Sequence, residues 1–123
     1  MDRLWIVFGA VFGIAGTVAA AGAAHATGPG SLDVAAHFLL FHAPVLLVLP
    51  MLISHGFVHA KAASLGGWLL LAGVALFSGE LALRALTGQT LFPMAAPTGG
   101  TLIILGWLTT GLSALLARRT RNA

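Results

Sequence analysis

The 123-residue chain contains no cysteine, and only 7% of its residues are charged. The lack of cysteine excludes disulfide bonds, thiolate metal sites and cysteine nucleophiles. With three acidic residues in the whole chain, hydrolysis by a pair of carboxylates is not expected. The sequence motifs of serine hydrolases, phosphate-binding loops, zinc proteases and dinucleotide-binding domains are also absent. We therefore expect a protein that is not an enzyme and that holds no cofactor.

Hydrophobic residues, in contrast, make up 59% of the chain, and the mean hydropathy is +1.00. They form four long runs, at residues 4–26, 34–60, 64–86 and 97–117. A helix rises 1.5 Å per residue, so about 20 residues cross the roughly 30 Å of hydrocarbon in a bilayer, and each run is long enough to do so. The sequence predicts an all-α fold in which a single domain forms an integral membrane four-helix bundle.

The positive charges predict how these spans are oriented. Five of the six Lys and Arg residues lie at alternate ends of the runs: Arg3, Lys61, Arg118, Arg119 and Arg121. The connections at residues 27–33 and 87–96 contain none. Since Lys and Arg are retained on the cytoplasmic side during insertion, we expect a protein of the bacterial inner membrane with both termini cytoplasmic. The net charge of +3 then reflects a basic tail near membrane lipid and not a nucleic-acid interface.

Three local patterns bear on how the spans are processed, joined and packed. Residues 24–26 resemble a signal-peptide cleavage site, but the first run exceeds the usual length of about 7–15 residues, so we expect it to remain as a span. Residues 61–63 are the only connection between the second and third runs, which predicts a tight antiparallel hairpin. Frequent glycines in the first, third and fourth runs predict close helix contacts, either inside the bundle or across a homo-oligomer.

The ionisable residues inside the spans are the first candidates for a site, because charges are costly in hydrocarbon. Glu80 and Arg84 are four residues apart, the spacing at which helical side chains pair. A hairpin that turns near Ala62 sets residue 42 opposite residue 82. We therefore predict a buried polar cluster of His42, Glu80 and Arg84, which either locks the helices together or relays protons or a solute.

The other histidines suggest two weaker sites. His25, Asp33 and His37 lie near the predicted outer surface and could form a metal or polar site there. His55 and His59 form a pair near the cytoplasmic end, but no third ligand is apparent beside them. A role at the membrane interface is the simpler expectation for this inner pair. Haem ligation between spans is not expected, since only His25 and His37 match in depth on separate helices.

The chain resembles a known family, the YgdD-like small inner-membrane proteins of domain-of-unknown-function family 423. The segments that carry this resemblance are Gly22-Ala23-Ala24-His25-Ala26, Phe41-His42-Ala43, Gly67-Trp68-Leu69-Leu70-Leu71-Ala72-Gly73, Leu76-Phe77-Ser78-Gly79, Ala85-Leu86-Thr87-Gly88, Pro97-Thr98-Gly99-Gly100 and Gly106-Trp107-Leu108. The resemblance implies a four-helix inner-membrane protein with no established biochemical activity. Glu80 stands where a small or hydroxyl residue is more typical, so no role of Glu80 is inherited from the family.

Together these observations favour a non-enzymatic function as an accessory, assembly or scaffolding component of the membrane. Its expected partners are membrane lipid and either other membrane proteins or further copies of the chain. Two alternatives remain open at this point. One is a small-solute or ion permease that acts as an oligomer, and the other is a metal- or quinone-linked redox protein that uses the outer histidines.

Overall fold

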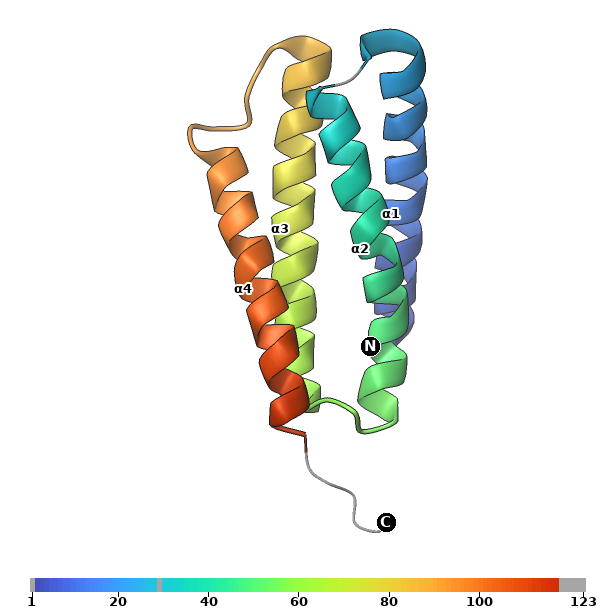
Figure 1. Ribbon diagram of the computed structural model, residues 1–123, viewed down its shortest axis with the longest axis vertical. Helices are drawn as coiled ribbons and strands as arrows, with labels where there is room; N and C mark the ends of the chain where they lie inside the picture. The colour runs from blue at the N-terminus through green and yellow to red at the C-terminus, as the bar shows by residue number, and fades with distance from the viewer. Residues whose placement is uncertain (1, 29, 118–123) are drawn as a thin grey trace.

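The computed structural model describes residues 2–28 and 30–117, and it contains four long helices (Figure 1). Helix α1 (Asp2–Gly22) continues into one π-helical turn, η1 (Ala23–Thr27). The other helices are α2 (Ser31–Ser54), α3 (Ala60–Thr87) and α4 (Ala95–Leu115). All four are long and apolar enough to cross a membrane. The predicted all-α fold with four membrane-spanning helices is confirmed.

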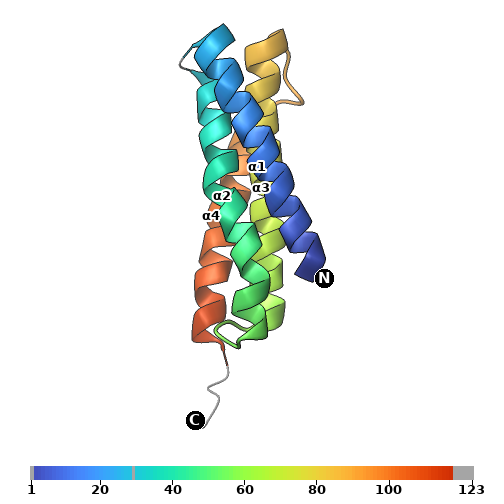
Figure 2. The same cartoon turned by 90° about the vertical axis from the view of Figure 1, so that its right-hand side faces the viewer.

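The helices pair in chain order: α1 packs on α2, α2 on α3, and α3 on α4. The start of α1, the turn between α2 and α3, and the end of α4 lie toward one end of the bundle, which we call the turn end (Figure 1). At the opposite end, the loop end, lie η1 and the connection between α3 and α4. Figure 2 shows that α1 crosses the bundle obliquely, from beside α2 at the loop end toward α3 at the turn end.

The connection between α2 and α3 differs from the prediction. Helix α2 ends at Ser54 and α3 begins at Ala60, so residues 61–63 form the first turn of α3 and are not the connector. Gly56 takes a left-handed conformation with φ 76°. The extended His59 then begins α3, because its ring Nδ1 accepts a hydrogen bond from the backbone N–H of Ala62 at 3.2 Å. The apolar pair Phe57 and Val58 masked this break in the sequence.

The core at the turn end is built around Trp5. This side chain is 2% exposed, and its ring lies 4.9 Å from that of Trp68, centroid to centroid. A Cβ added at Gly67 would lie 2.7 Å from the Trp5 ring, so glycine makes room for the indole. The tilt of α1 toward α3 (Figure 2) thus brings Trp5 into the bundle, against Trp68 of α3.

Candidate functional site

The most completely buried ionisable side chain is Glu80 in α3, with 0% exposure. Its Oε2 accepts a hydrogen bond from Nη2 of Arg84 at 2.6 Å, one helical turn further on. Its Oε1 accepts a hydrogen bond from the backbone N–H of Leu91 at 2.7 Å. We call Glu80, Arg84 and Leu91 the loop anchor, since together they tie the α3–α4 connection to α3.

The unequal lengths of α3 and α4 explain why this anchor is needed. Helix α3 has 28 residues and α4 has 21, so the connecting loop at residues 88–94 returns alongside α3 before α4 begins (Figure 1). This return brings Leu91 back to the level of Glu80. A non-helical backbone N–H at membrane depth has no water to bind and must find an acceptor within the protein. The carboxylate of Glu80 supplies that acceptor.

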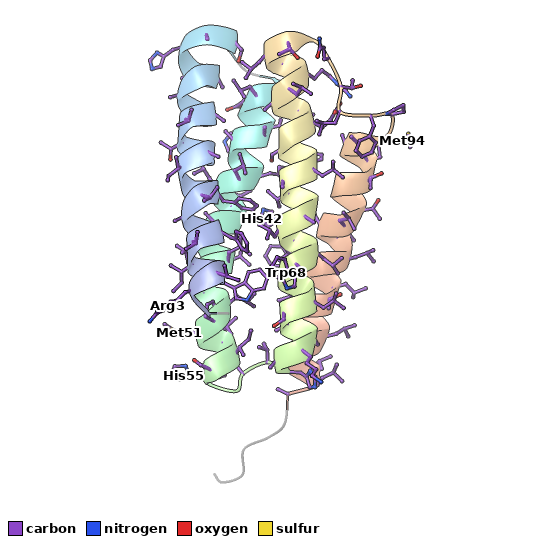
Figure 3. The ribbon with its side chains drawn as sticks, turned by 180° about the vertical axis from the view of Figure 1, so that it is seen from behind. Arg3, His42, Met51, His55, Trp68 and Met94 are labelled. Carbon is purple, nitrogen blue, oxygen red and sulfur yellow. The ribbon has the colours of Figure 1, made fainter. Side chains whose placement is uncertain are left out.

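His42 belongs to a different contact, between α2 and α4. Its ring is 4% exposed and lies inside the bundle (Figure 3). Nδ1 lies 2.7 Å from the backbone oxygen of Phe38, and the indole N–H of Trp107 donates to Nε2 at 3.1 Å. A carbonyl oxygen only accepts hydrogen bonds, so Nδ1 must carry the proton and Nε2 must be the acceptor. This geometry requires a neutral imidazole.

The predicted cluster of His42, Glu80 and Arg84 is thus divided into two sites. Throughout the described part of the chain, no hydrogen bond or ion pair joins His42 to Glu80. The reason is that the turn between α2 and α3 comes earlier in the chain than the predicted turn near Ala62.

Two contacts show the true register of α2 against α3. The rings of Phe38 and Phe77 are 4.6 Å apart, and Ser78 Oγ donates to the backbone oxygen of Ala35 at 3.0 Å. These pairs centre the hairpin near residue 57, which sets His42 opposite residue 72. That level is about 12 Å along the helix from Glu80.

The outer histidines do not form a ligand set. Nδ1 of His37 lies 2.7 Å from the backbone oxygen of Asp33 and 3.7 Å from its carboxylate, within one turn of α2. His25 lies on the exposed π-helical turn η1. In the ranges 2–28 and 30–117, no group of three or more His, Asp or Glu side chains lies close enough to hold a metal ion. The structure therefore does not bring the three residues together as a metal site.

The inner histidines lie on either side of the turn between α2 and α3. His55 directly follows α2, and its Nδ1 is 3.0 Å from the backbone oxygen of Met51. His59 precedes α3 and accepts from Ala62, as described above. His59 also donates its backbone N–H to the oxygen of Ser113 at 2.7 Å, which ties the turn to α4. Each histidine serves the end of a helix, and the two do not share a helical face.

The buried polar atoms are satisfied within the chain itself. Among the residues that the structure describes, no buried side-chain nitrogen or oxygen lacks a hydrogen-bond partner. The larger hollows lie along helix surfaces and are lined almost entirely by apolar side chains. One, of about 530 Å³, lies between α1 and α2 and is lined by Ala10, Gly13, Ile14, Thr17, Val18 and Leu40. Another, of about 450 Å³, lies where α1 diverges from α3 and is lined by Ala15, Val18, Ala19, Gly22, Leu32, Ala82 and Leu86.

Comparison with known proteins places this architecture in a family. The family described as "Protein of unknown function (DUF423)" matches residues 13–100. A UPF0382 membrane protein of Staphylococcus epidermidis is 33% identical over 78 residues, which are 63% of this chain and 62% of that protein. A UPF0382 membrane protein of Staphylococcus haemolyticus is 34% identical over 74 residues, 60% of this chain and 58% of that protein.

These alignments span a little less than two thirds of the length of the relatives. No solved structure matches the chain. The matched region runs from the middle of α1 to the first turns of α4, and so it includes His42 and the whole loop anchor. The resemblance recognised in the sequence is confirmed, and the chain belongs to this family of membrane proteins of unknown function.

Proposed function

We propose that this protein is a non-enzymatic accessory component of the bacterial inner membrane, which assembles with other membrane proteins through the lipid-facing sides of its edge helices. The observation that carries this proposal is the self-contained polar interior. A relay or a permease needs polar groups that remain available to a proton or solute. Here the buried polar side chains pair with one another or with backbone, and in the described residues none is left over.

The edge helices offer faces suited to assembly. Helices α1 and α4 each pack mainly on one neighbour. On α4, a Cβ added at Gly100 or Gly111 would meet nothing within 4 Å. Ile104, between these glycines, is 69% exposed. In lipid, helices associate where small residues allow close backbone approach, so the open side of α4 is the surface through which we expect a partner helix to bind.

The proposed orientation combines the fold with the charges. The beginning of α1, the α2–α3 turn and the end of α4 share the turn end (Figure 1). Arg3 and Lys61 lie at this end, and Arg118, Arg119 and Arg121, which are outside the described residues, follow α4 in the sequence. Retention of Lys and Arg in the cytoplasm supports a cytoplasmic turn end. Reporter fusions to the two termini test this orientation. Reporters found on opposite sides of the membrane would contradict it.

The function is tested by photo-crosslinking in native membranes. A photoreactive amino acid replaces Ile104 on α4 or, as a matched control, Phe41, which is similarly exposed on α2. We expect a crosslinked membrane protein, either a different chain or a second copy, from position 104 and mainly lipid adducts from position 41. Gentle detergent extraction should release the same complex. A chain that extracts as a monomer, with only lipid adducts at both positions, would overturn the proposal.

A further inference from the structure

Within the loop anchor, the two charged side chains differ sharply in exposure. The Glu80 side chain is 0% exposed, whereas that of Arg84 is 51% exposed. A guanidinium group has five N–H donors. Over residues 2–28 and 30–117, the one hydrogen bond that Arg84 donates from its side chain is from Nη2 to Glu80. The anchor therefore buries its negative charge and turns the remaining donors of its positive charge outward.

The position of Arg84 along α3 places these donors near lipid headgroups. Helix α3 runs from Ala60 to Thr87, so its midpoint lies between residues 73 and 74. At 1.5 Å per residue, Arg84 is about 16 Å from that midpoint. The hydrocarbon core of a bilayer extends about 15 Å from its centre. With α3 centred on the bilayer, the Cα of Arg84 lies at the boundary between hydrocarbon and headgroups, and its guanidinium, which reaches back to Glu80, lies just inside that boundary.

The loop that binds Glu80 also exposes apolar side chains. Leu91 is 49% exposed, Phe92 44% and Met94 69%. The backbone of Leu91 binds the same carboxylate as Arg84, so the loop passes close to the guanidinium, and Phe92 and Met94 follow Leu91 in this loop. Met94 projects sideways from the bundle, away from the helices (Figure 3). Apolar side chains that point sideways at this depth suit contact with the upper parts of acyl chains.

We propose that Arg84 binds the phosphate of a phospholipid in the leaflet at the loop end, and that Leu91, Phe92 and Met94 contact the acyl chains of this lipid. The planar guanidinium matches phosphate with two parallel N–H···O bonds. Glu80 holds the guanidinium in place before the lipid arrives, which lowers the entropy lost on binding. The site requires no protein partner, and so it goes beyond the proposed function.

The test measures the distance between lipid phosphorus and Arg84 by solid-state NMR. Replacing the other four arginines with lysine, in the variant Arg3→Lys, Arg118→Lys, Arg119→Lys and Arg121→Lys, keeps the charge and leaves Arg84 as the single guanidinium. Arginine labelled with ¹³C at the guanidinium carbon is then reconstituted with phosphatidylethanolamine and phosphatidylglycerol. We expect ³¹P to dephase at least about half of the ¹³C signal, as a direct guanidinium–phosphate contact requires. No dephasing would overturn the proposal.

Further measurements distinguish a phospholipid from free phosphate and test the contact with its acyl chains. In vesicles of galactolipid with added inorganic phosphate, we expect no dephasing, and dephasing equal to that in phospholipid would assign the site to free phosphate. Met94→Ser does not alter the Glu80–Arg84 ion pair, and we expect it to reduce the dephasing of the ¹³C signal by phospholipid. Unchanged dephasing would overturn the proposed acyl-chain contact. If the four-lysine variant does not fold, the unmodified chain is compared with Arg84→Lys, and identical dephasing in both would contradict the site.

Discussion

The two helix pairs at the edges of the bundle, α1–α2 and α3–α4, both use glycine at their contact, but against different atoms. A Cβ added at Gly16 of α1 would lie 2.7 Å from a side-chain carbon of Leu40 in α2. A Cβ added at Gly99 of α4 would lie 2.7 Å from the backbone nitrogen of Phe77 and 2.9 Å from the backbone oxygen of Gly73 in α3. At these glycines, α1 packs against a leucine side chain of α2, whereas α4 packs against the backbone of α3.

The atoms that each glycine meets indicate where the bundle can adapt. A leucine side chain can change rotamer to accommodate an added methyl group, whereas a helix backbone can only move as a unit. We therefore expect the α3–α4 contact at Gly99 to be rigid and the α1–α2 contact at Gly16 to tolerate change; the contrast is between these two positions, since a Cβ added at Gly9 of α1 would also meet backbone, 2.9 Å from the oxygen of Ala43.

Gly99→Ala should be the most damaging of these substitutions. Its methyl group would force α4 away from the backbone of α3, and we expect the free energy of unfolding to fall by about 2–3 kcal/mol. The neighbouring Gly100 meets nothing within 4 Å, so Gly100→Ala is the matched control and should change stability by less than about 0.5 kcal/mol. Unfolding in mixed detergent micelles, followed by circular dichroism, measures both. Equal losses would contradict backbone contact between α3 and α4.

Glu80→Gln should cause a smaller loss of stability than Gly99→Ala. Glutamine keeps an oxygen that can accept from the Leu91 N–H, but it removes the charge that pairs with Arg84. The loop should therefore open more often, and we expect hydrogen exchange at the Leu91 amide to become on the order of tenfold faster. Gln89→Ala, at an exposed position in the same loop, should leave that rate unchanged. A variant with wild-type exchange and wild-type thermal stability would show that the anchor does not hold the loop.

Gly16→Ala probes the adaptable contact between α1 and α2. Because the atom in the way belongs to the side chain of Leu40, repacking should limit the loss to about 1 kcal/mol. Gly13, one turn earlier on α1, has open space around it, and Gly13→Ala serves as the control. If Gly16→Ala costs as much as Gly99→Ala, the proposed contrast between the two helix pairs fails.

Trp107→Phe should have the smallest effect. It removes the hydrogen bond to Nε2 of His42 and keeps an aromatic ring, so we expect a loss of about 0.6 kcal/mol, typical of hydrogen bonds between helices in membranes. A double-mutant cycle with His42→Ala isolates the free energy of the Trp107–His42 interaction, since the loss of other His42 contacts cancels. A coupling energy of zero would mean that the bond contributes nothing to holding α4 against α2.

Much of the fold was predictable from run length alone. Four apolar runs of sufficient length gave four helices, and the predicted i, i+4 pair of Glu80 and Arg84 is present. The boundary between α2 and α3 was not predictable, because Phe57 and Val58 continue the apolar run through the turn. The available signals were Gly56, with its left-handed backbone, and His59, which begins α3 in place of a more usual capping residue.

The partners of the buried polar groups were less predictable than the helices. A five-residue shift in the centre of the hairpin, from residue 62 to residue 57, moved His42 away from Glu80 and toward Trp107. The second partner of Glu80 was also missed, because it is a backbone N–H. Nothing in the identity of Leu91 signals that its amide returns to α3. The length of the predicted connection, residues 87–96, is a sequence feature that could have suggested such a return.

Four membrane-spanning helices follow from the amino-acid sequence alone. Hydrocarbon requires each span to satisfy its own backbone over a fixed length, and both conditions are local. The contacts of Glu80 with the loop and of His42 with Trp107, in contrast, follow from how the helices pack. Those choices depend on the register and tilt of helices that are distant in sequence, and a shift of a few residues in one turn is enough to change every partner along the pair.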